Sequence, residues 1–266
     1  MNIKKFALIY NSEIKASPST KDDLAEILDA KKINYDILDI DNLKKGYDIA
    51  FVIGGDGTIL KAARFFAQSE TAIFGINLGR LGFLSQSSKE EFEKALNKIL
   101  NNEYRIENRL MLEADNNIAL NDFVIKSSEQ GRTSRFQLNI NGKQVCNYLA
   151  DGIIISTPTG STAYGLSAGG PVLAPEIEAF VIVPICPHTL TARPLVIPAT
   201  EKISISAPNE DKEFILSVDG QGNHIIKNEL NISKSKFQAK LLILNDSEFY
   251  TILKNKLNWG VSPNYC

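Results

Sequence analysis

Four short apolar runs in the first 80 residues restrict the possible folds of this chain more than any other feature. They span residues 6–10, 35–40, 49–53 and 72–76, and segments with helical periodicity separate them. Apolar runs of about five residues that alternate with helical patterns are typical of parallel strands joined by crossover helices. We therefore predict an open α/β domain over residues 1–110.

Three helices are expected in this half. Thr20 is expected to cap the first helix, and Ser88 and Glu91 have the capping-box spacing in front of the third. Each helix has an apolar stripe at helical period. The stripes consist of Leu24, Ile27 and Leu28, of Ile59, Ala63, Phe66 and Ala67, and of Phe92, Leu96, Ile99 and Leu100.

The pattern changes to β-rich runs after about residue 110. Asn141-Gly142 lies between two such runs, which predicts a tight hairpin turn. Further strands are expected at residues 152–156, 179–184, 202–207, 214–218, 225–226, 230–232 and 239–244. We predict a β-rich domain over 111–245 and a segment, 246–266, that contains a short helix and packs back on the first domain.

The composition favours a small-molecule ligand. The 29 Lys and Arg residues nearly balance the 31 Asp and Glu residues without basic tracts, so a nucleic-acid partner is not expected. No segment approaches the roughly 20 apolar residues that cross a bilayer, and the first apolar run is too short for a signal peptide. Cys146, Cys186 and Cys266 lack metal-ligand spacing, so we expect reduced thiols and a cytoplasmic protein.

The first motif with chemical meaning is Gly54-Gly55-Asp56-Gly57-Thr58, which joins an apolar strand to a helical pattern. Glycines at such a turn let backbone N–H groups approach phosphate oxygens at a helix N-terminus. The motif is neither a Walker A sequence nor GxGxxG. A carboxylate 4 Å from a phosphate oxygen is repelled by about 4 kcal/mol at an effective dielectric constant near 20.

Asp56 therefore needs a compensating role. It either accepts the proton of an acceptor hydroxyl or shares a Mg²⁺ ion with a triphosphate. The alternative is an N-capping Asp in a tight turn. No cage of protein metal ligands is predicted, so a divalent ion is expected to arrive with the triphosphate.

The second motif follows Asp151-Gly152 and an apolar strand. It reads STPTGSTAY over residues 156–164, followed by SAGGP over 167–171. Small and hydroxyl-bearing residues surround one aromatic ring, Tyr164, which suits close backbone approach, hydrogen bonds to a polar ligand and stacking on a base. The alternative for Tyr164 is a ring in the hydrophobic core.

These motifs, in this order, resemble those of bacterial NAD kinases. The resemblance runs from about residue 50 to 260 and includes GGDGT, Asn121-Asp122, DGIIISTPTGSTAYGLSAGGP, PHTLTARPLVI, SVDGQ and the terminal LNWG. GGDGT alone also occurs in diacylglycerol and sphingosine kinases. The STPTGSTAY segment together with the later segments is specific to NAD kinases.

The resemblance implies roles for residues around both motifs. Asp56 would accept the proton of the adenosine ribose 2′-hydroxyl, with Gly57 and Lys61 also near NAD, and Asn121 and Asp122 would hold ribose hydroxyls. Gly54, Gly55, Gly57 and Thr58 would contact the triphosphate. Lys61 has the alternative of a solvated helix face, and Asn121-Asp122 that of a simple turn.

The remaining implied NAD contacts lie in the β-rich half. They are Arg132, Leu149, Asp151, Thr162, Ala163, Tyr164, Gly165, Leu166, Ser167 and Gln221. Leu149 departs from the family, in which many members have a basic residue at this position, and Arg132 or Arg135 would then compensate the pyrophosphate charge. His188 is expected to be a structural residue.

The resemblance implies an ATP-dependent kinase that converts NAD to NADP with a divalent cation. Its active site is expected in the cleft between the two domains, and a homodimer or homotetramer is expected. Three other classes stay open: a lipid or sugar kinase, a non-catalytic NAD(P) sensor and a dehydrogenase.

Overall fold

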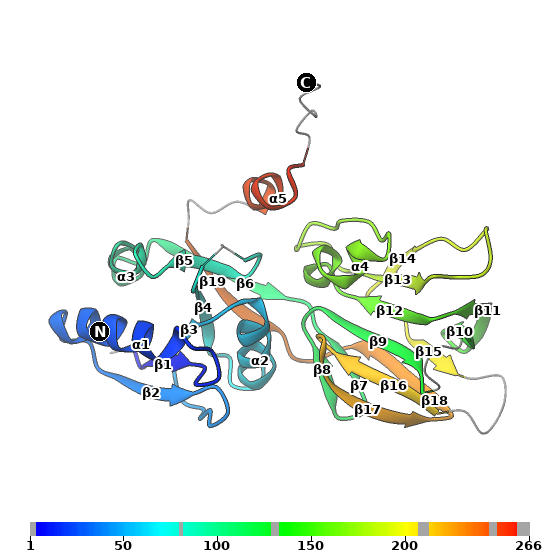
Figure 1. The fold of residues 1–266 in the computed structure, drawn as a ribbon, viewed down its shortest axis with the longest axis horizontal. Coiled ribbons are helices and arrows are strands. Elements are labelled where there is room, and N and C mark those ends of the chain that lie inside the picture. The colour runs from blue at the N-terminus through cyan, green and yellow to red at the C-terminus, as the bar shows by residue number, and fades with distance from the viewer. Residues whose placement is uncertain (1–3, 80–81, 129–132, 207–212, 245–248, 260–266) are drawn as a thin grey trace. The chain divides into compact units, whose positions relative to one another are not determined.

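The chain folds into two compact units. The computed structural model describes residues 4–79, 82–128, 133–206, 213–244 and 249–259. Unit 1 comprises Met1–Asn108 and Lys240–Cys266, and unit 2 comprises Arg109–Ala239 (Figure 1). Arg132 and Cys266 lie outside the described residues.

Unit 1 has an α/β fold, as predicted. Within the described residues its sheet has seven strands in the order β2-β1-β3-β4-β19-β6, with β5 paired to β4. Strands β2, β1, β3 and β4 are parallel neighbours. The strands are β1 Phe6–Tyr10, β2 Tyr35–Asp39, β3 Ile49–Ile53, β4 Ala72–Asn77, β5 Ser85–Ser88, β6 Tyr104–Arg109 and β19 Ala239–Leu244.

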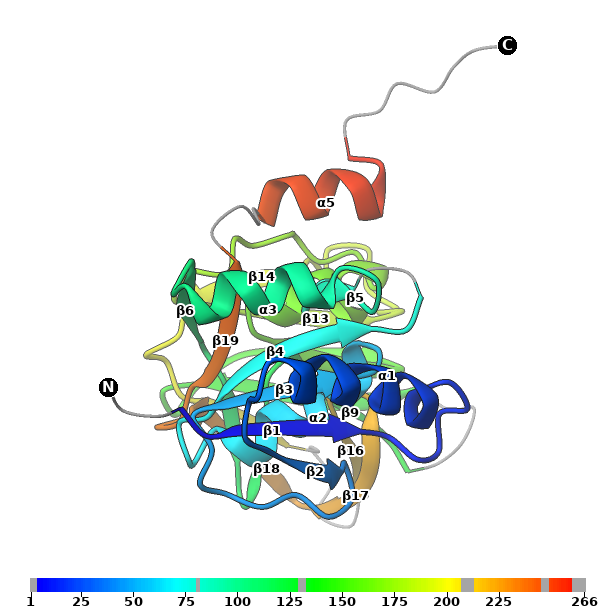
Figure 2. The same cartoon turned by 90° about the vertical axis from the view of Figure 1, so that its left-hand side faces the viewer.

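Helices cover both faces of this sheet. Helices α1 (Ser17–Ala30) and α3 (Phe92–Leu100) share a core with Phe51 of β3 and Phe74 of β4 on the face shown in Figure 2. Helix α2 (Asp56–Phe66) packs on the other face, where its Ile59 approaches Gly75. The predicted stripes are buried apart from partly exposed Ile27 and exposed Leu100, which confirms their helical period.

Two predicted helix starts are wrong. Helix α1 begins at Ser17, with a proline in its first turn, so Thr20 lies inside the helix. Helix α3 begins at Phe92 because Ser88 still belongs to strand β5, and Glu91 is the N-cap residue. Among the described residues neither helix has a side-chain cap hydrogen bond.

Unit 2 is β-rich, as predicted, and its described strands form two six-stranded sheets. One has the order β11-β10-β15-β18-β7-β8 and the other β14-β13-β12-β9-β16-β17. The strands are β7 Leu112–Ala114, β8 Asn117–Ala119, β9 Asp122–Ser127, β10 Ser134–Ile140, β11 Lys143–Ala150, β12 Gly152–Ser156, β13 Ala179–Ile185, β14 Leu195–Pro198, β15 Ile203–Ser206, β16 Glu213–Val218, β17 Gln221–Lys227 and β18 Glu229–Lys234.

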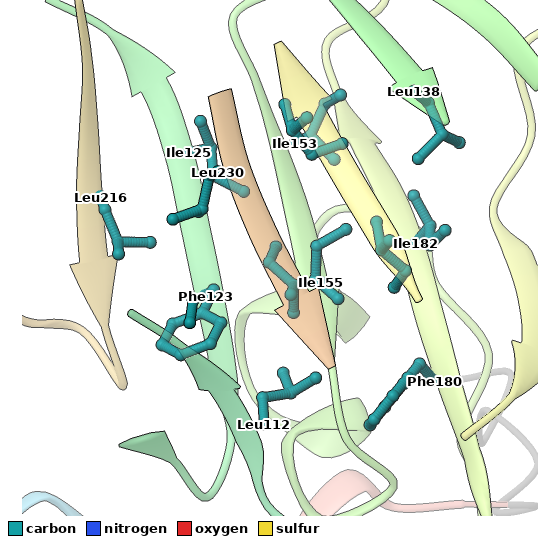
Figure 3. Packing of buried hydrophobic residues seen from close by; sticks show 14 of the residues in the cluster. Leu112, Phe123, Ile125, Leu138, Ile153, Ile155, Phe180, Ile182, Leu216 and Leu230 are labelled. Atoms are coloured by element: carbon teal, nitrogen blue, oxygen red, sulfur yellow. The ribbon is translucent and has the colours of Figure 1, made fainter. Parts of the chain in front are cut away.

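One apolar core joins the two sheets of unit 2. Side chains from both sheets, including Leu138 and Leu230 of one and Phe123 and Ile155 of the other, belong to a single buried cluster (Figure 3). A second, smaller cluster around Ile154 lies on the opposite face of the β12 sheet and includes Leu173 of the segment after β12. This segment, which contains the STPTGSTAY motif, thus packs on the outer face of that sheet.

Residues 239–244 belong to a different sheet from the one predicted. We expected this run in the β-rich half, but Leu241 of β19 pairs in parallel with Ile73 of β4 in unit 1. Five of the six residues of β19 are buried, as in the centre of a parallel sheet. A continuous apolar run does not specify which sheet it joins.

The C-terminal helix and the hairpin turn form at the positions predicted from the sequence. Helix α5 spans Phe249–Leu257, and Asn141 and Gly142 both have positive φ between β10 and β11, as a type I′ turn requires. None of the helices in the described ranges is long and apolar enough to cross a membrane.

The packing of α2 on β4 generates the first prediction. A Cβ on Gly75 would lie 2.4 Å from Cδ1 of Ile59 and 3.0 Å from Cα of Ser85. Gly75→Ala should therefore lower the free energy of unfolding by roughly 1–3 kcal/mol in urea titrations. Adding Ile59→Val, which removes Cδ1, should recover part of this loss.

Gly79→Ala is the control for this experiment. No described heavy atom lies within 4 Å of a Cβ placed there, and φ is not in the left-handed region. If the stability changes of Gly75→Ala and Ile59→Val were additive, the close contact between position 75 and Ile59 would be contradicted.

Candidate active-site residues in the two units

The GGDGT turn joins β3 to α2 at the carboxyl end of the parallel strand. Gly55 is the N-cap residue of α2, with φ −81° and ψ 179°, and Asp56 is the first helical residue. The N-cap alternative for Asp56 is therefore wrong. A Cβ on Gly54 would lie 2.6 Å from Cβ of Thr58, whereas no described heavy atom lies within 4 Å of a Cβ on Gly55. The backbone at Gly55 is thus open to an approaching group.

The carboxylate of Asp56 is held by a second glycine-containing turn. It accepts the backbone N–H groups of Phe83 at 3.0 Å and Leu84 at 3.2 Å. A Cβ on Gly82 would lie 2.0 Å from Oδ1 of Asp56, so this position needs glycine. Asp56 remains partly exposed, and each carboxylate oxygen can accept a further hydrogen bond.

Sequence reasoning missed residues 82–84. The available signal was a glycine-rich stretch, LGRLGFLS, soon after the strand at 72–76. The rule that ligands bind at the carboxyl ends of parallel strands applies there as it does to GGDGT.

Lys61 lies one helical turn after Gly57, as expected. Its ammonium pairs with the carboxylate of Asp41 in the segment after β2, and both side chains are about half exposed. Lys61 therefore lies on a solvated helix face with an acidic partner. Exposed pairs of this kind contribute about 0–1 kcal/mol, so an anionic ligand can displace the carboxylate at little cost.

Asn121 directly precedes strand β9 in unit 2 and Asp122 is its first residue; a buried carboxylate accepts hydrogen bonds from their backbone. Asp219, 7% exposed, accepts the N–H groups of Leu120 at 3.1 Å, Asn121 at 2.7 Å and Asp122 at 3.1 Å. The N–H of Asp219 donates to the carbonyl oxygen of Asp122 at 2.9 Å. The dipeptide is thus more than a simple turn, and Asp219 is a residue that sequence reasoning passed over inside the SVDGQ segment.

The STPTGSTAY segment packs on the other side of the same backbone. Thr157 donates its N–H to the carbonyl of Asn121 at 2.9 Å and its hydroxyl to the carbonyl of Leu120 at 2.5 Å. A Cβ on Gly160 would lie 2.1 Å from the carbonyl oxygen of Asn121. The structure therefore brings together two motifs that lie more than 30 residues apart.

The aromatic ring of this segment faces outward. Tyr164, in α4 (Tyr164–Ser167), is 39% exposed, so the core-ring alternative is wrong. The ammonium of Lys126, on neighbouring strand β9, lies 5.5 Å from the ring centroid. Asp151 and Ser167 are also exposed, whereas Thr162, Ala163 and Leu166 are partly buried and Gly165 is buried.

Asp122 is the side chain with the most perturbed ionisation in this region. It is 3% exposed, and burial, followed by repulsion from the Asp219 carboxylate, raises its pKa to about 7. Perturbed carboxyl groups of this kind are enriched at functional sites, where ionisation is tuned for binding or proton transfer.

The remaining predicted NAD contacts in the described part of unit 2 lie in both of its sheets. Gln221 begins β17 directly after the Asp219-Gly220 turn. Leu149 lies on β11, in the other sheet, where it pairs with exposed Arg135 and accepts the N–H of His188 at 2.8 Å. The His188 side chain is exposed. Within the described ranges, no group of three His, Cys, Asp or Glu side chains is arranged to hold a metal ion.

The second prediction compares two glycines of the STPTGSTAY region. Gly160→Ala should destabilise the protein by several times RT, about 2 kcal/mol or more, because backbone atoms of Asn121 fill the Cβ position. Gly165→Ala should be tolerated because its Cβ would make ordinary contacts at 3.7 to 3.8 Å. Thermal and urea unfolding measure the stability of both variants. Equal losses of stability would contradict the close approach of Gly160 to the Asn121 backbone.

The contribution of Asp122 to the stability of the fold should depend on pH. Asp122 takes up a proton near pH 7 when folded but near pH 4 when unfolded, so its contribution to stability falls as pH rises between these values. Asp122→Asn cannot ionise, and its stability relative to the unmodified protein should rise with pH by at most about 1.4 kcal/mol per unit. Urea titrations from pH 5 to 8.5 measure this difference. A difference independent of pH would contradict the raised pKa.

Comparison with known proteins identifies the family of this chain. Family models for the ATP-NAD kinase N-terminal and C-terminal domains match residues 8–104 and 120–244. The chain is 43% identical to an NAD kinase of Carboxydothermus hydrogenoformans over 233 residues, which cover 84% of this chain and 83% of the relative. It is 41% identical to an NAD kinase of Aquifex aeolicus over 227 residues, which cover 81% and 83%.

Solved structures show the same fold. An NAD kinase from Archaeoglobus fulgidus, crystallised with ATP, superposes with a TM-score of 0.82 at 28% identity, covering 96% of this chain and 98% of that one. A yeast NADH kinase complexed with NADH has a TM-score of 0.84 at 24% identity, covering 100% and 91%. This chain therefore belongs to the ATP-NAD kinase family, because the two family models and relatives covered over most of their length match it.

Proposed function

We propose that this protein is an ATP-dependent NAD kinase that phosphorylates the 2′-hydroxyl of the adenosine ribose of NAD and releases NADP. The observation that carries the proposal is the setting of Asp56. Its carboxylate lies at the N-terminus of α2, partly exposed, beside an open glycine backbone and held by two N–H groups. Membership of the ATP-NAD kinase family supports the choice of substrates.

In the proposal, unit 1 binds the phosphoryl donor. Gly54, Gly55, Gly57 and Thr58 form the turn at the start of α2, where N–H groups and the helix dipole favour phosphate oxygens. Lys61 would exchange Asp41 for a phosphate or dinucleotide oxygen. The half-exposed pair with Asp41 supports this exchange because little stability is lost when it opens.

Unit 2 supplies most of the dinucleotide contacts. Asn121 and Asp122 would bind ribose hydroxyls, since an amide and a carboxyl group together match a vicinal diol. Residues 162–167 would line the adenosine pocket, with the exposed ring of Tyr164 available to a base. Asp151, Arg132, Leu149 and Gln221 are the remaining proposed contacts.

Asp56 is proposed as the general base. It accepts the proton of the 2′-hydroxyl as the ribose oxygen forms a bond to the γ-phosphorus. The bond from the γ-phosphorus to the β,γ-bridging oxygen breaks at the same time, and ADP leaves. Because two N–H groups orient the carboxylate before the reaction, its alignment with the hydroxyl costs little at that moment.

A divalent cation, Mg²⁺ by preference, is proposed to bind with the triphosphate. The described residues offer no carboxylate cluster for it, whereas phosphate oxygens and a single carboxylate suit magnesium. When bound, the ion would neutralise charge on the phosphates, and Asp56 would share it with the phosphate oxygens. A homodimer or homotetramer in the cytoplasm remains a prediction from the family resemblance.

The fourth prediction tests Asp56 directly. Asp56→Asn should lower turnover by about 10²- to 10⁴-fold, because the amide cannot accept a proton, while NAD binding is largely kept. NADP formation from NAD, ATP and Mg²⁺ is measured with an NADP-specific dehydrogenase, and NAD binding by calorimetry. Asp22→Asn, at a mostly exposed carboxylate of α1, is the control.

Turnover above a tenth of the unmodified rate would rule out Asp56 as the base. NAD binding without NADP formation from any triphosphate or polyphosphate would favour a sensor. Phosphorylation of diacylglycerol but not of NAD would favour a lipid kinase.

A further inference from the structure

Two tight turns in unit 2 have nearly the same φ values but different first residues. Asn141-Gly142 has φ values of +51° and +73°, and Asp219-Gly220 has φ values of +50° and +69°. Each joins a pair of antiparallel strands. Asn-Gly and Asp-Gly both suit this type I′ turn, so the turn alone does not distinguish Asp from Asn at position 219.

The Asp219 side chain makes bonds that an amide cannot reproduce. Its Oδ1 accepts two N–H groups, from Asn121 and Asp122, and its Oδ2 accepts a third, from Leu120. An Asn side chain has one acceptor oxygen and would turn an NH₂ group toward at least one of these N–H groups. By contrast, Asn141 uses its side-chain oxygen to accept one N–H, from Lys202.

The site of these bonds is the dipeptide assigned to ribose binding. Leu120 and Asn121 connect β8 to β9, which begins at Asp122, and a shift of this backbone would move the Asn121 and Asp122 side chains together. The carboxylate is buried, where hydrogen bonds to a charged acceptor contribute more than neutral ones.

We propose that Asp219 is a positioning residue for the dinucleotide, which fixes the backbone of residues 120–122 so that Asn121 and Asp122 meet the ribose hydroxyls. The proposal rests on the function proposed above. Asp219 acts through its neighbours and not on the reacting atoms, so its loss should weaken NAD binding and leave the phosphoryl-transfer step intact.

The test is Asp219→Asn, which keeps the size of the side chain and suits positive φ. NAD affinity by calorimetry and the KM for NAD should both change by about ten- to a hundred-fold. The values of kcat and of KM for ATP should stay within about threefold. Asp219→Gly, which also suits the turn, takes its place if the Asp219→Asn variant does not fold.

A double-mutant cycle separates positioning from general destabilisation. If Asp219 acts through the dipeptide, Asp219→Asn should change NAD affinity much less in an Asp122→Asn background than in the unmodified protein. Gly142→Ala is the matched control, because it disturbs the equivalent turn and should lower stability without changing KM for NAD.

The outcomes distinguish this inference from the proposed function. Unchanged NAD affinity in a folded Asp219 variant overturns the positioning role, as does a loss that is additive with Asp122→Asn. Normal NAD binding without NADP formation by the unmodified protein overturns the kinase assignment but leaves the affinity test of Asp219 in place. If the unmodified protein does not bind NAD, both proposals fall.

Discussion

The bonds to the short connection between β8 and β9 are the constraint on which the candidate site of unit 2 depends. Residues 120–122 include backbone groups outside any sheet ladder, and buried backbone groups need partners. Asp219 accepts their N–H groups, while Ser156 and Thr157 donate to the carbonyl oxygens of Leu120 and Asn121. Three distant segments therefore have to fold together before Asn121 and Asp122 acquire a defined position.

A carboxylate that accepts backbone N–H groups occurs in both units, with opposite exposure. Asp56 accepts two N–H groups and stays partly exposed, so its remaining acceptor capacity faces solvent or a ligand. Asp219 accepts three and is buried. In each unit a glycine allows a close approach: Gly82 lies beside the Asp56 carboxylate, and Gly160 lies beside the backbone of Asn121. The same interaction orients the carboxylate proposed as the general base in one unit and holds the backbone proposed to bind ribose in the other.

Asp122 is a buried carboxyl group at the start of a strand whose next three residues are apolar. A carboxyl group is buried next to a second carboxylate, which raises its pKa and makes its ionised form unfavourable in the folded state. An apolar side chain at position 122, like those of Val124 and Ile154 on the same face of the sheet, would stabilise the fold more than a carboxyl group does. Neither the sheet nor the core requires a carboxyl group there, and the ribose-binding role proposed for Asp122 would account for it.

The sequence by itself determined most elements and the main motifs. Strand and helix periods predicted β1 to β4, α2, the Asn141-Gly142 hairpin and the α/β and β-rich halves, because hydrophobic period and turn chemistry are local properties. GGDGT and STPTGSTAY were recognisable because their residue types suit phosphate and hydroxyl contacts. Only the tertiary structure decided which sheet β19 joins, that residues 82–84 bind Asp56, and that Asp219 holds Asn121 and Asp122. Those facts depend on contacts between residues far apart in the chain, and a local pattern carries no information about which distant backbone will come within hydrogen-bond distance.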